Sequence, residues 1–147
     1  MAIFYETVGV AFPKIKRREI ARWIKRVIEK FNKQVGAITY IFCSDEEILR
    51  INQLYLNHDY YTDIITFDYS EGDKLSGDLF ISLETVKTNS EKYKTAYDEE
   101  LRRVMIHGIL HLSGFDDKTP EERKIMRAKE DEALNLIELN NENLFNL

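Results

Sequence analysis

Four stretches of the chain have the residue pattern of β-strands. Apolar, β-branched and aromatic residues predominate in each, at 3–12, 36–43, 62–69 and 78–83. Pro13 ends the first stretch, because proline lacks the amide proton that a strand ladder requires. A polar, glycine-containing segment between the third and fourth stretches predicts a turn-rich connection.

Helical spacing of apolar residues in other stretches predicts helices at 16–33, 44–56, 83–94, 97–113 and 120–139. The first is amphipathic, with its basic residues outward and an apolar face of Ile20, Trp23, Ile24, Val27, Ile28 and Phe31. Ser44 with Glu47 matches a capping box, and Gly114 fits the left-handed position after the fourth helix. Thr119 and Pro120 match the N-cap and first residue of the last helix.

The order of these elements predicts an α/β (α+β) fold with one small mixed four-stranded sheet and about five helices. There is no repeat, low-complexity run or linker, so we expect residues 1–147 to form a single domain. Residues 140–147 are expected to be a loose C-terminal tail.

Composition indicates a soluble globular protein, with 44% apolar and 32% charged residues and no apolar run long enough to span a membrane. The N-terminus does not match a signal peptide, because its apolar part precedes the basic cluster and contains Glu6. The one cysteine, Cys43, cannot form an internal disulfide and is expected to be a buried apolar side chain in a strand. We therefore expect a cytoplasmic protein.

The charge is distributed unevenly. Residues 14–33 contain nine Lys or Arg and two Glu, a net charge of +7, whereas the rest of the chain carries −12. A basic helix on an acidic body is a possible nucleic-acid interface, and a solvated helix face without a partner is the alternative. The candidate nucleic-acid-binding residues are Lys16, Arg17, Arg22, Lys25 and Arg26. A protein partner is the other possible contact of this helix.

The segment "HGILHLSGFDD", residues 107–117, has the spacing of a metal site. His107 and His111 share one helix face, Gly114 turns the chain, and Asp117 follows, which reproduces the ligand spacing of metzincin peptidases. Such peptidases carry a glutamate base directly after the first histidine, but this chain has Gly108. The pattern therefore indicates a zincin-like metal helix without the peptidase mechanism. Aspartate is an acceptable zinc ligand in the third position.

Four segments together resemble the YbeY family of rRNA maturation factors, which are single-metal endoribonucleases. They are residues 51–69 ("INQLYLNHDYYTDIITFDY"), 77–86 ("GDLFISLETV"), 107–117 and 121–134 ("EERKIMRAKEDEAL"). The resemblance implies a small mixed sheet with helices, one divalent ion per chain, Zn²⁺, and action on rRNA or the ribosomal small subunit. It also implies a role in ribosome maturation and quality control, and no membrane partner.

Carried over by position, the family's metal ligands fall on His107, His111 and Asp117, where Asp117 replaces the usual third histidine. Leu56 stands where the family usually has an arginine of the active-site cleft, and His58 or the basic helix is a candidate to supply the missing positive charge. Asp68 replaces a frequent proline. No general base is identified: Asp116 has an alternative role in stabilising the loop, and capping or turn chemistry accounts for Thr62 and Asp59. Gly77 and Asp78 are expected to mark the start of a strand.

Two functions remain open from the sequence. The first is a metal-dependent endoribonuclease acting in rRNA maturation. The second is a non-catalytic ribosome-assembly factor, in which the metal stabilises the helix end at Gly114 and the cleft binds RNA without cutting it. The missing arginine favours the second more than it would in a standard family member. A peptidase is disfavoured because Gly108 has no side chain.

Overall fold

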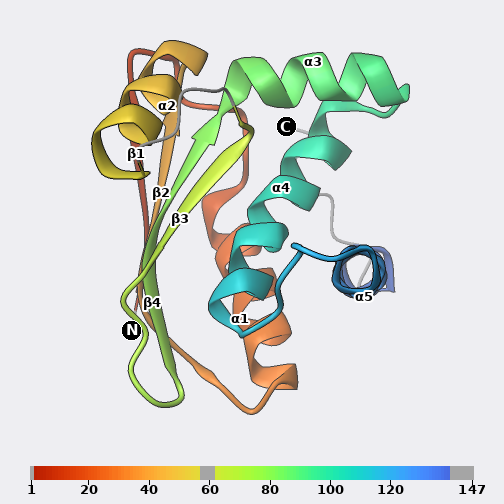
Figure 1. Cartoon of the computed structure of the whole chain (residues 1–147). Coiled ribbons are helices and arrows are strands. Elements are labelled where there is room, and N and C mark those ends of the chain that lie inside the picture. Colours follow the sequence, from red (N-terminus) through yellow and green to blue (C-terminus); the bar gives the residue numbers. More distant parts are fainter. Residues whose placement is uncertain (1, 57–61, 140–147) are drawn as a thin grey trace.

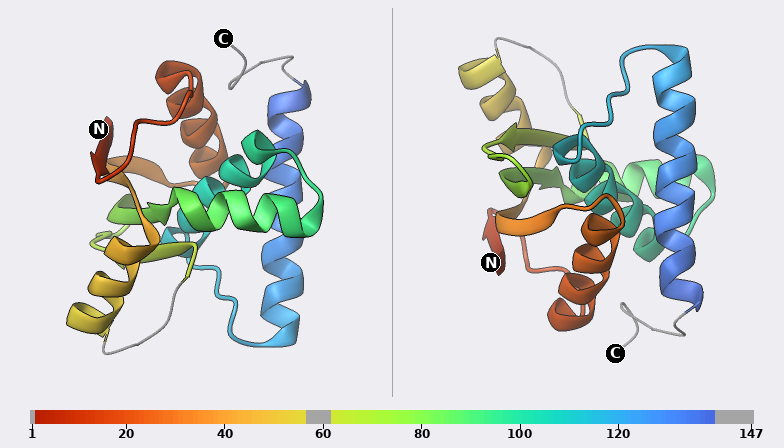
Figure 2. Two further views of the ribbon diagram at one scale, coloured as in Figure 1. Left: turned by 90° about the horizontal axis from the view of Figure 1, so that it is seen from above. Right: turned by 90° about the horizontal axis from the view of Figure 1, so that it is seen from below.

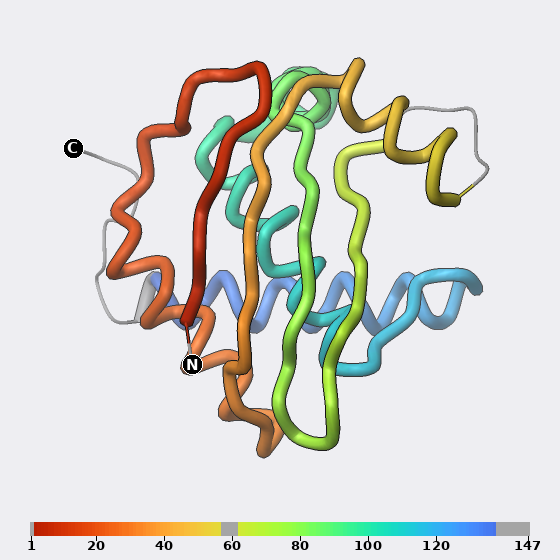
Figure 3. The backbone as a smooth tube through the Cα atoms, turned by 90° about the vertical axis from the view of Figure 1, so that its left-hand side faces the viewer, coloured from red at the N-terminus to blue at the C-terminus, as the bar shows by residue number. Residues whose placement is uncertain are grey.

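The computed structural model describes residues 2–56 and 62–139 and contains one four-stranded mixed sheet (Figure 1). Its strands are β1 (Ala2–Val8), β2 (Gln34–Cys43), β3 (Ile64–Asp68) and β4 (Lys74–Ser82). Figure 3 shows their order, β1-β2-β4-β3, from one side of the sheet to the other. β1, β2 and β4 are parallel, whereas the edge strand β3 is antiparallel to β4. The predicted four-stranded mixed sheet is therefore confirmed.

Within the described residues, five α-helices surround the sheet, as predicted: α1 (Arg17–Lys30), α2 (Asp45–Ile51), α3 (Leu83–Tyr93), α4 (Tyr97–Leu112) and α5 (Pro120–Leu139). Figures 1 and 2 show α1 and α4 on one face, α5 outside α4, and α2 on the opposite face. The residues between α4 and the sheet belong to one large core cluster, and a smaller cluster lies beneath α2. This arrangement places the predicted metal helix, α4, directly under the sheet.

Two buried polar side chains connect the helices to the rest of the core. The indole Nε1 of Trp23 in α1 donates a hydrogen bond of 2.8 Å to the carbonyl oxygen of Ala133 in α5. The hydroxyl of Tyr40 in β2 donates a bond of 2.9 Å to the carbonyl oxygen of Met105 in α4. Both side chains are fully buried. Because a buried donor without a partner is costly, each bond favours a single packing of its helix.

The predicted helix boundaries agree closely with the structure. The Ser44 hydroxyl accepts a hydrogen bond from the Glu47 amide, so the capping role of Ser44 is confirmed. Gly114 follows α4 with a positive φ of 106°, as expected. The predicted helix over 44–56 divides into α2 and a π-helical turn, η1 (Asn52–Leu56). Cys43 is buried in β2, and burial raises the pKa of its thiol to about 12.

Two strand predictions were wrong in detail. β1 ends at Val8 because the chain turns at Gly9, which has a φ of 72°, instead of continuing to residue 12. β4 begins at Lys74, so Gly77 and Asp78 lie within the strand and do not mark its start. A Cβ atom at Gly77 would lie 2.4 Å from the Phe67 carbonyl oxygen, so the adjacent strand requires glycine there. The predicted tail, 140–147, lies outside the described residues, and no helix within the described part is long and apolar enough to cross a membrane.

Candidate metal centre

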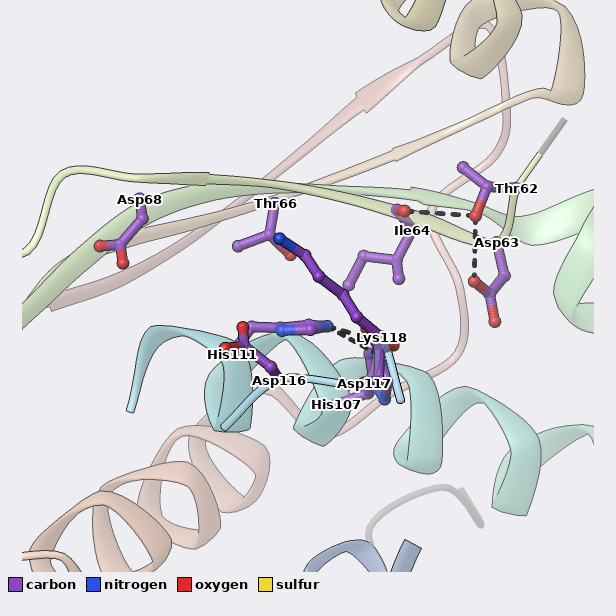
Figure 4. A pocket seen from close by; sticks show the side chains of 10 residues that line it. All are labelled: Thr62, Asp63, Ile64, Thr66, Asp68, His107, His111, Asp116, Asp117 and Lys118. Atoms are coloured by element: carbon purple, nitrogen blue, oxygen red, sulfur yellow. Dashed lines mark hydrogen bonds and ion pairs between the residues drawn. The ribbon is translucent and has the colours of Figure 1, made fainter. Parts of the chain in front are cut away.

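α4 and the loop after it bring together the three residues that the sequence suggested as metal ligands. His107 and His111 are one helical turn apart and face the same cavity (Figure 4). α4 ends at Leu112, where the Gly114 amide donates to the His111 carbonyl and the Phe115 amide donates to the Leu110 carbonyl. These two bonds satisfy carbonyl groups that the helix end leaves open. The turn directs the following loop back over the helix, so that Asp117 reaches the histidines.

Three side-chain atoms converge at this point. The Nε2 atoms of His107 and His111 are 3.0 Å apart, and Oδ2 of Asp117 lies 3.1 Å and 3.5 Å from them, respectively. In a tetrahedral zinc site, with metal–ligand distances near 2.0–2.1 Å, neighbouring ligand atoms are about 3.3–3.4 Å apart. The three separations are close to this value. Two imidazoles and one carboxylate are also a donor set that zinc accepts, so these residues fit one divalent ion.

Glu130 of α5 holds His107 from the other side of its ring. The Nδ1 atom of His107 is 2.7 Å from Oε2 of Glu130, whose side chain is only 7% exposed. When Nδ1–H donates to this carboxylate, the Nε2 atom of the neutral ring presents its lone pair to the cavity. Arg103 donates to Oε1 of Glu130 at 2.9 Å and to Asp131 at 2.8 Å. The ring orientation that a metal ligand needs is therefore built into the contact between α4 and α5.

The charges around His107 outweigh its burial. Burial lowers the pKa of the imidazole, but the hydrogen bond with Glu130 and the carboxylates of Asp63 and Asp117 raise it, and the net shift is upward. The surroundings of this histidine therefore favour positive charge. A divalent cation would benefit from the same carboxylates, because it also neutralises their charge.

Gly108 occupies the position where zinc peptidases carry their glutamate. A Cβ atom at this position would lie 2.9 Å from Cδ1 of Ile64 and 3.2 Å from both Cδ atoms of Leu79. The helix thus packs closely against β3 and β4 immediately beside the first histidine. A larger side chain at position 108 would require the Ile64 and Leu79 side chains to shift, so the packing here favours glycine.

The convergent atoms lie in an open cavity of about 540 Å³ between α4 and the edge strand β3. Its lining is mainly polar and comprises Thr62, Asp63, Ile64, Thr66, Asp68, His107, His111, Asp116, Asp117 and Lys118. Figure 4 shows the side chain of Lys118 extending across the cavity toward Thr66. Burial raises the pKa of Asp63, although the charge of His107 opposes this shift. The cavity thus contains a cation and several carboxylates within reach of a ligand.

The structure separates the basic residues of α1 and Leu56 from this cavity, whereas Thr62 and Asp116 line it. Exposed basic residues of α1, among them Arg17, Arg22 and Lys25, lie on a different part of the surface and do not line it. Leu56 is 39% exposed in η1 and does not line it either. The Thr62 hydroxyl lies 3.5 Å from both the Asp63 carboxylate and the Ile64 carbonyl, which supports a local turn role. His58 and Asp59 lie outside the described residues.

Three residues of the site, Glu130, Arg103 and Lys118, were not predicted from the sequence. A signal for Glu130 was present, because this acid occurs in the apolar stripe of α5 with Met126, Ala133, Leu134 and Ile137. Arg103 precedes His107 by four residues and so shares its helix face. Lys118 had no comparable signal, since its position depends on the path of the loop after Gly114.

Comparisons with known proteins agree with this architecture. The family model described as Endoribonuclease YbeY matches residues 10–138. A relative from Bacteroides fragilis named Endoribonuclease YbeY is 64% identical, and the match covers 91% of this chain and 96% of that protein. A relative of the same name from Bacteroides thetaiotaomicron is 61% identical, and the match covers 91% of this chain and 98% of that protein. A solution structure from Thermotoga maritima is 25% identical and has a TM-score of 0.65, covering 95% of this chain and 93% of that one. Both the family match and the relatives extend over most of the chain, which therefore belongs to the endoribonuclease YbeY family.

Proposed function

We propose that this chain is a metal-dependent endoribonuclease that acts on rRNA during ribosome maturation, with His107, His111 and Asp117 holding one divalent ion. The observation that carries the proposal is the convergence of three ligand atoms, all within 4.8 Å of one another, in a polar cavity. Relatives that match almost the entire chain are named endoribonucleases. Zn²⁺ is the ion that best fits two imidazoles and one carboxylate.

Three ligands leave room for a water molecule or a phosphoryl oxygen. A bound divalent ion would supply Lewis acidity, polarising a phosphodiester and lowering the pKa of a water molecule. The protein's contribution is to hold the ligand atoms in place. Glu130 fixes the His107 ring, and the turn at Gly114 fixes Asp117. Outer partners of this kind raise metal affinity by preventing the ligand rings from rotating.

Lys118 is our candidate for the positive charge that the family arginine would supply. Leu56 occupies the arginine position and is apolar, whereas Lys118 lines the cavity from the same loop as Asp117. An ammonium group beside the ion would attract the phosphodiester and offset charge that develops on its oxygens. Lysine provides a mobile point charge in place of a bidentate guanidinium, so its clamp on the phosphate is less geometrically specific.

Asp63 is our candidate for the proton acceptor. It lies in the lining of the same cavity, and burial raises the pKa of its carboxyl above the usual value, against the influence of His107. A carboxylate with a raised pKa is a better base for a water molecule or a 2′-hydroxyl than an exposed one. Asp116 also lines the cavity but is exposed.

RNA affinity would come in part from the basic face of α1. The candidates remain Lys16, Arg17, Arg22, Lys25 and Arg26. Their charges would attract the RNA backbone without reading its sequence. Together with the small-subunit rRNA implied by the family, this favours a cytoplasmic protein that meets its substrate on the ribosome or a precursor of it. A ribosomal protein or a GTPase is the alternative partner for this helix.

A second function is favoured by one specific observation, the apolar Leu56 at the usual arginine position. In this alternative, the ion stabilises the end of α4 and the cleft binds RNA without cutting it. The two functions are separated by incubating a precursor rRNA fragment with the zinc-loaded protein and with H111A. A matched control is D98N, which changes an exposed carboxylate at the start of α4, outside the metal cavity. Cleavage that H111A loses and D98N retains supports the nuclease; RNA that stays intact with every protein contradicts it.

A further inference from the structure

A second cavity of about 510 Å³ adjoins the metal cavity. Asp63 and His107 line both cavities, so the second cavity lies directly beside the metal centre. The additional lining residues include Glu100 and Arg103 from α4, Arg127 from α5, and Tyr93 and Thr95 near the end of α3. The nuclease proposal assigns no role to this second cavity.

Two polar side chains in the lining make no hydrogen bond to another described residue. Glu100 is only 8% exposed, and the charges of Arg103 and Arg127 act on its carboxylate. The hydroxyl oxygen of Thr95 is fully buried and lacks a hydrogen-bond partner among the described residues. Buried polar groups in folded proteins are almost always satisfied. The Thr95 hydroxyl and the Glu100 carboxylate therefore leave hydrogen-bonding capacity in this cavity that a ligand can use.

The charges in this cavity favour a neutral hydrogen-bond donor over an anion near Glu100. Burial and the carboxylates of Asp63 and Glu130 raise the pKa of Glu100, against the influence of Arg103 and Arg127. A phosphate would be repelled from Glu100, whereas a group with neutral N–H donors would be attracted. Arg103 is already occupied by Glu130 and Asp131. Arg127 is different, because its side chain is 65% exposed and its Nη1 atom is 3.9 Å from Glu130.

An aromatic ring lies beside these polar groups. Tyr93 is the last residue of α3 and is 58% exposed. The next residue, Lys94, adopts a left-handed conformation with a φ of 57°, which turns the chain from α3 toward α4. Exposed aromatic rings beside polar groups are how proteins bind single-stranded RNA, because the bases stack on the rings.

The spacing along α4 matches the dimensions of one nucleotide. Glu100, Arg103 and His107 follow one another at intervals of three and four residues and thus share a helix face. Glu100 precedes His107 by seven residues, a rise of about 10 Å along the helix axis. A nucleotide covers a comparable length between its phosphate and the far edge of its base.

We propose that the second cavity binds the nucleobase beside the phosphate at the metal centre, and that Glu100 selects guanine there. The inference rests on the proposed nuclease function. Guanine presents two neighbouring donors, N1–H and N2–H, on its Watson–Crick edge, and one carboxylate accepts both. Adenine and cytosine place an acceptor beside their amino group, and uracil has one N–H between two carbonyls. Each of these bases would set an acceptor against a carboxylate oxygen.

The test is a nuclear magnetic resonance titration of the full chain with GMP, AMP, CMP and UMP, with and without zinc. GMP is expected to bind at least about fivefold more tightly than the others, the low end of what a bidentate pair contributes. It is expected to shift the amide resonances of Thr95 and Glu100. E100Q should lose the preference for GMP, because an amide offers one acceptor oxygen. Y93A should lower the affinity for all four nucleotides by a similar factor. D98N, an exposed carboxylate in the same helical turn, is the matched control and should keep the preference.

Several outcomes would overturn the inference. They are equal affinities for the four nucleotides, a preference that survives in folded E100Q, or a response to N-acetyl-arginine methylamide as strong as that to GMP. The last result would indicate a basic protein partner instead. If E100Q does not fold, E100D provides the second variant, because retracting the carboxylate by one carbon should still reduce the preference. RNA cleavage without guanine preference would contradict this inference alone, whereas guanine binding by a chain that cuts no RNA would contradict only the nuclease proposal.

Discussion

Replacing Glu130 by glutamine tests whether the contact between α4 and α5 prepares the metal site. The substitution preserves the size of the side chain and removes its negative charge. Two bonds are affected, the 2.7 Å contact with Nδ1 of His107 and the 2.9 Å contact with Arg103. The Glu130 side chain is only 7% exposed, so water compensates little for the loss.

The magnitude follows from these contacts. Outer partners of metal-bound histidines typically contribute 10–100-fold to metal affinity, which corresponds to about 1.4–2.7 kcal/mol. We therefore expect E130Q to bind zinc about 10–100 times more weakly than the unaltered chain. A glutamine can still accept from one donor, so the fold should survive with a modest loss of stability, about 1–3 kcal/mol.

The assay is a competition for zinc between the protein and a chromophoric chelator at constant pH, with thermal unfolding measured in parallel. D131N is the matched control, since Asp131 follows directly in α5 and binds Arg103 at 2.8 Å, but its side chain is 57% exposed. It should bind zinc like the unaltered chain. Unchanged zinc affinity in folded E130Q would refute the reasoning, because Glu130 would then not orient His107.

Three further predictions concern stability and RNA binding. G77A should lower the free energy of unfolding, measured by chemical denaturation, by about 1–3 kcal/mol, because its Cβ atom would lie 2.4 Å from the Phe67 carbonyl oxygen. An unchanged free energy of unfolding would show that β3 and β4 are not this close at Gly77. The pKa of Glu100 is raised in the folded chain, so ionisation of Glu100 above its unfolded-state pKa destabilises the fold. E100Q removes this charge and should therefore raise the melting temperature near pH 7 but not near pH 3. An increase in melting temperature that is the same at both pH values would contradict this. Replacing Arg17, Arg22 and Lys25 by glutamine should weaken RNA binding for all sequences and lower the logarithmic salt slope by about 2, as measured by fluorescence anisotropy. An unchanged slope would remove α1 from the RNA interface.

Much of the fold could be predicted because local patterns and tertiary packing agree. The apolar stripe of α1 and the Ser44 cap of α2 specify their helices through neighbouring residues alone. The ends of β1 and β4 were harder to predict. Gly77 is required by the carbonyl of Phe67 on another strand, and no local pattern contains that information. Strand ends depend on partners distant in sequence, as is usual for sheets.

The candidate site likewise contains residues that local sequence predicts and residues whose positions depend on distant parts of the chain. His107 and His111 share a helix face through their spacing, and the motif spacing after Gly114 predicted Asp117 as the third ligand. The positions of the Glu130 and Lys118 side chains depend on how α5 and the loop after α4 return to the metal centre. The acid in the apolar stripe of α5 was a readable signal, because a buried carboxylate needs a partner. The second cavity was not predictable, since it requires α3, α4 and α5 in their relative positions.

The most direct test of the proposed nuclease measures zinc content and RNA cleavage in the same preparations of the unaltered chain and of D117A. The account predicts one zinc per chain and cleavage of a precursor rRNA fragment, with both greatly reduced in D117A. D117H, which restores the residue that is usual in the family, should retain both. A folded D117A that binds one zinc with unchanged affinity and cuts RNA at the original rate would contradict the metal centre proposed for His107, His111 and Asp117.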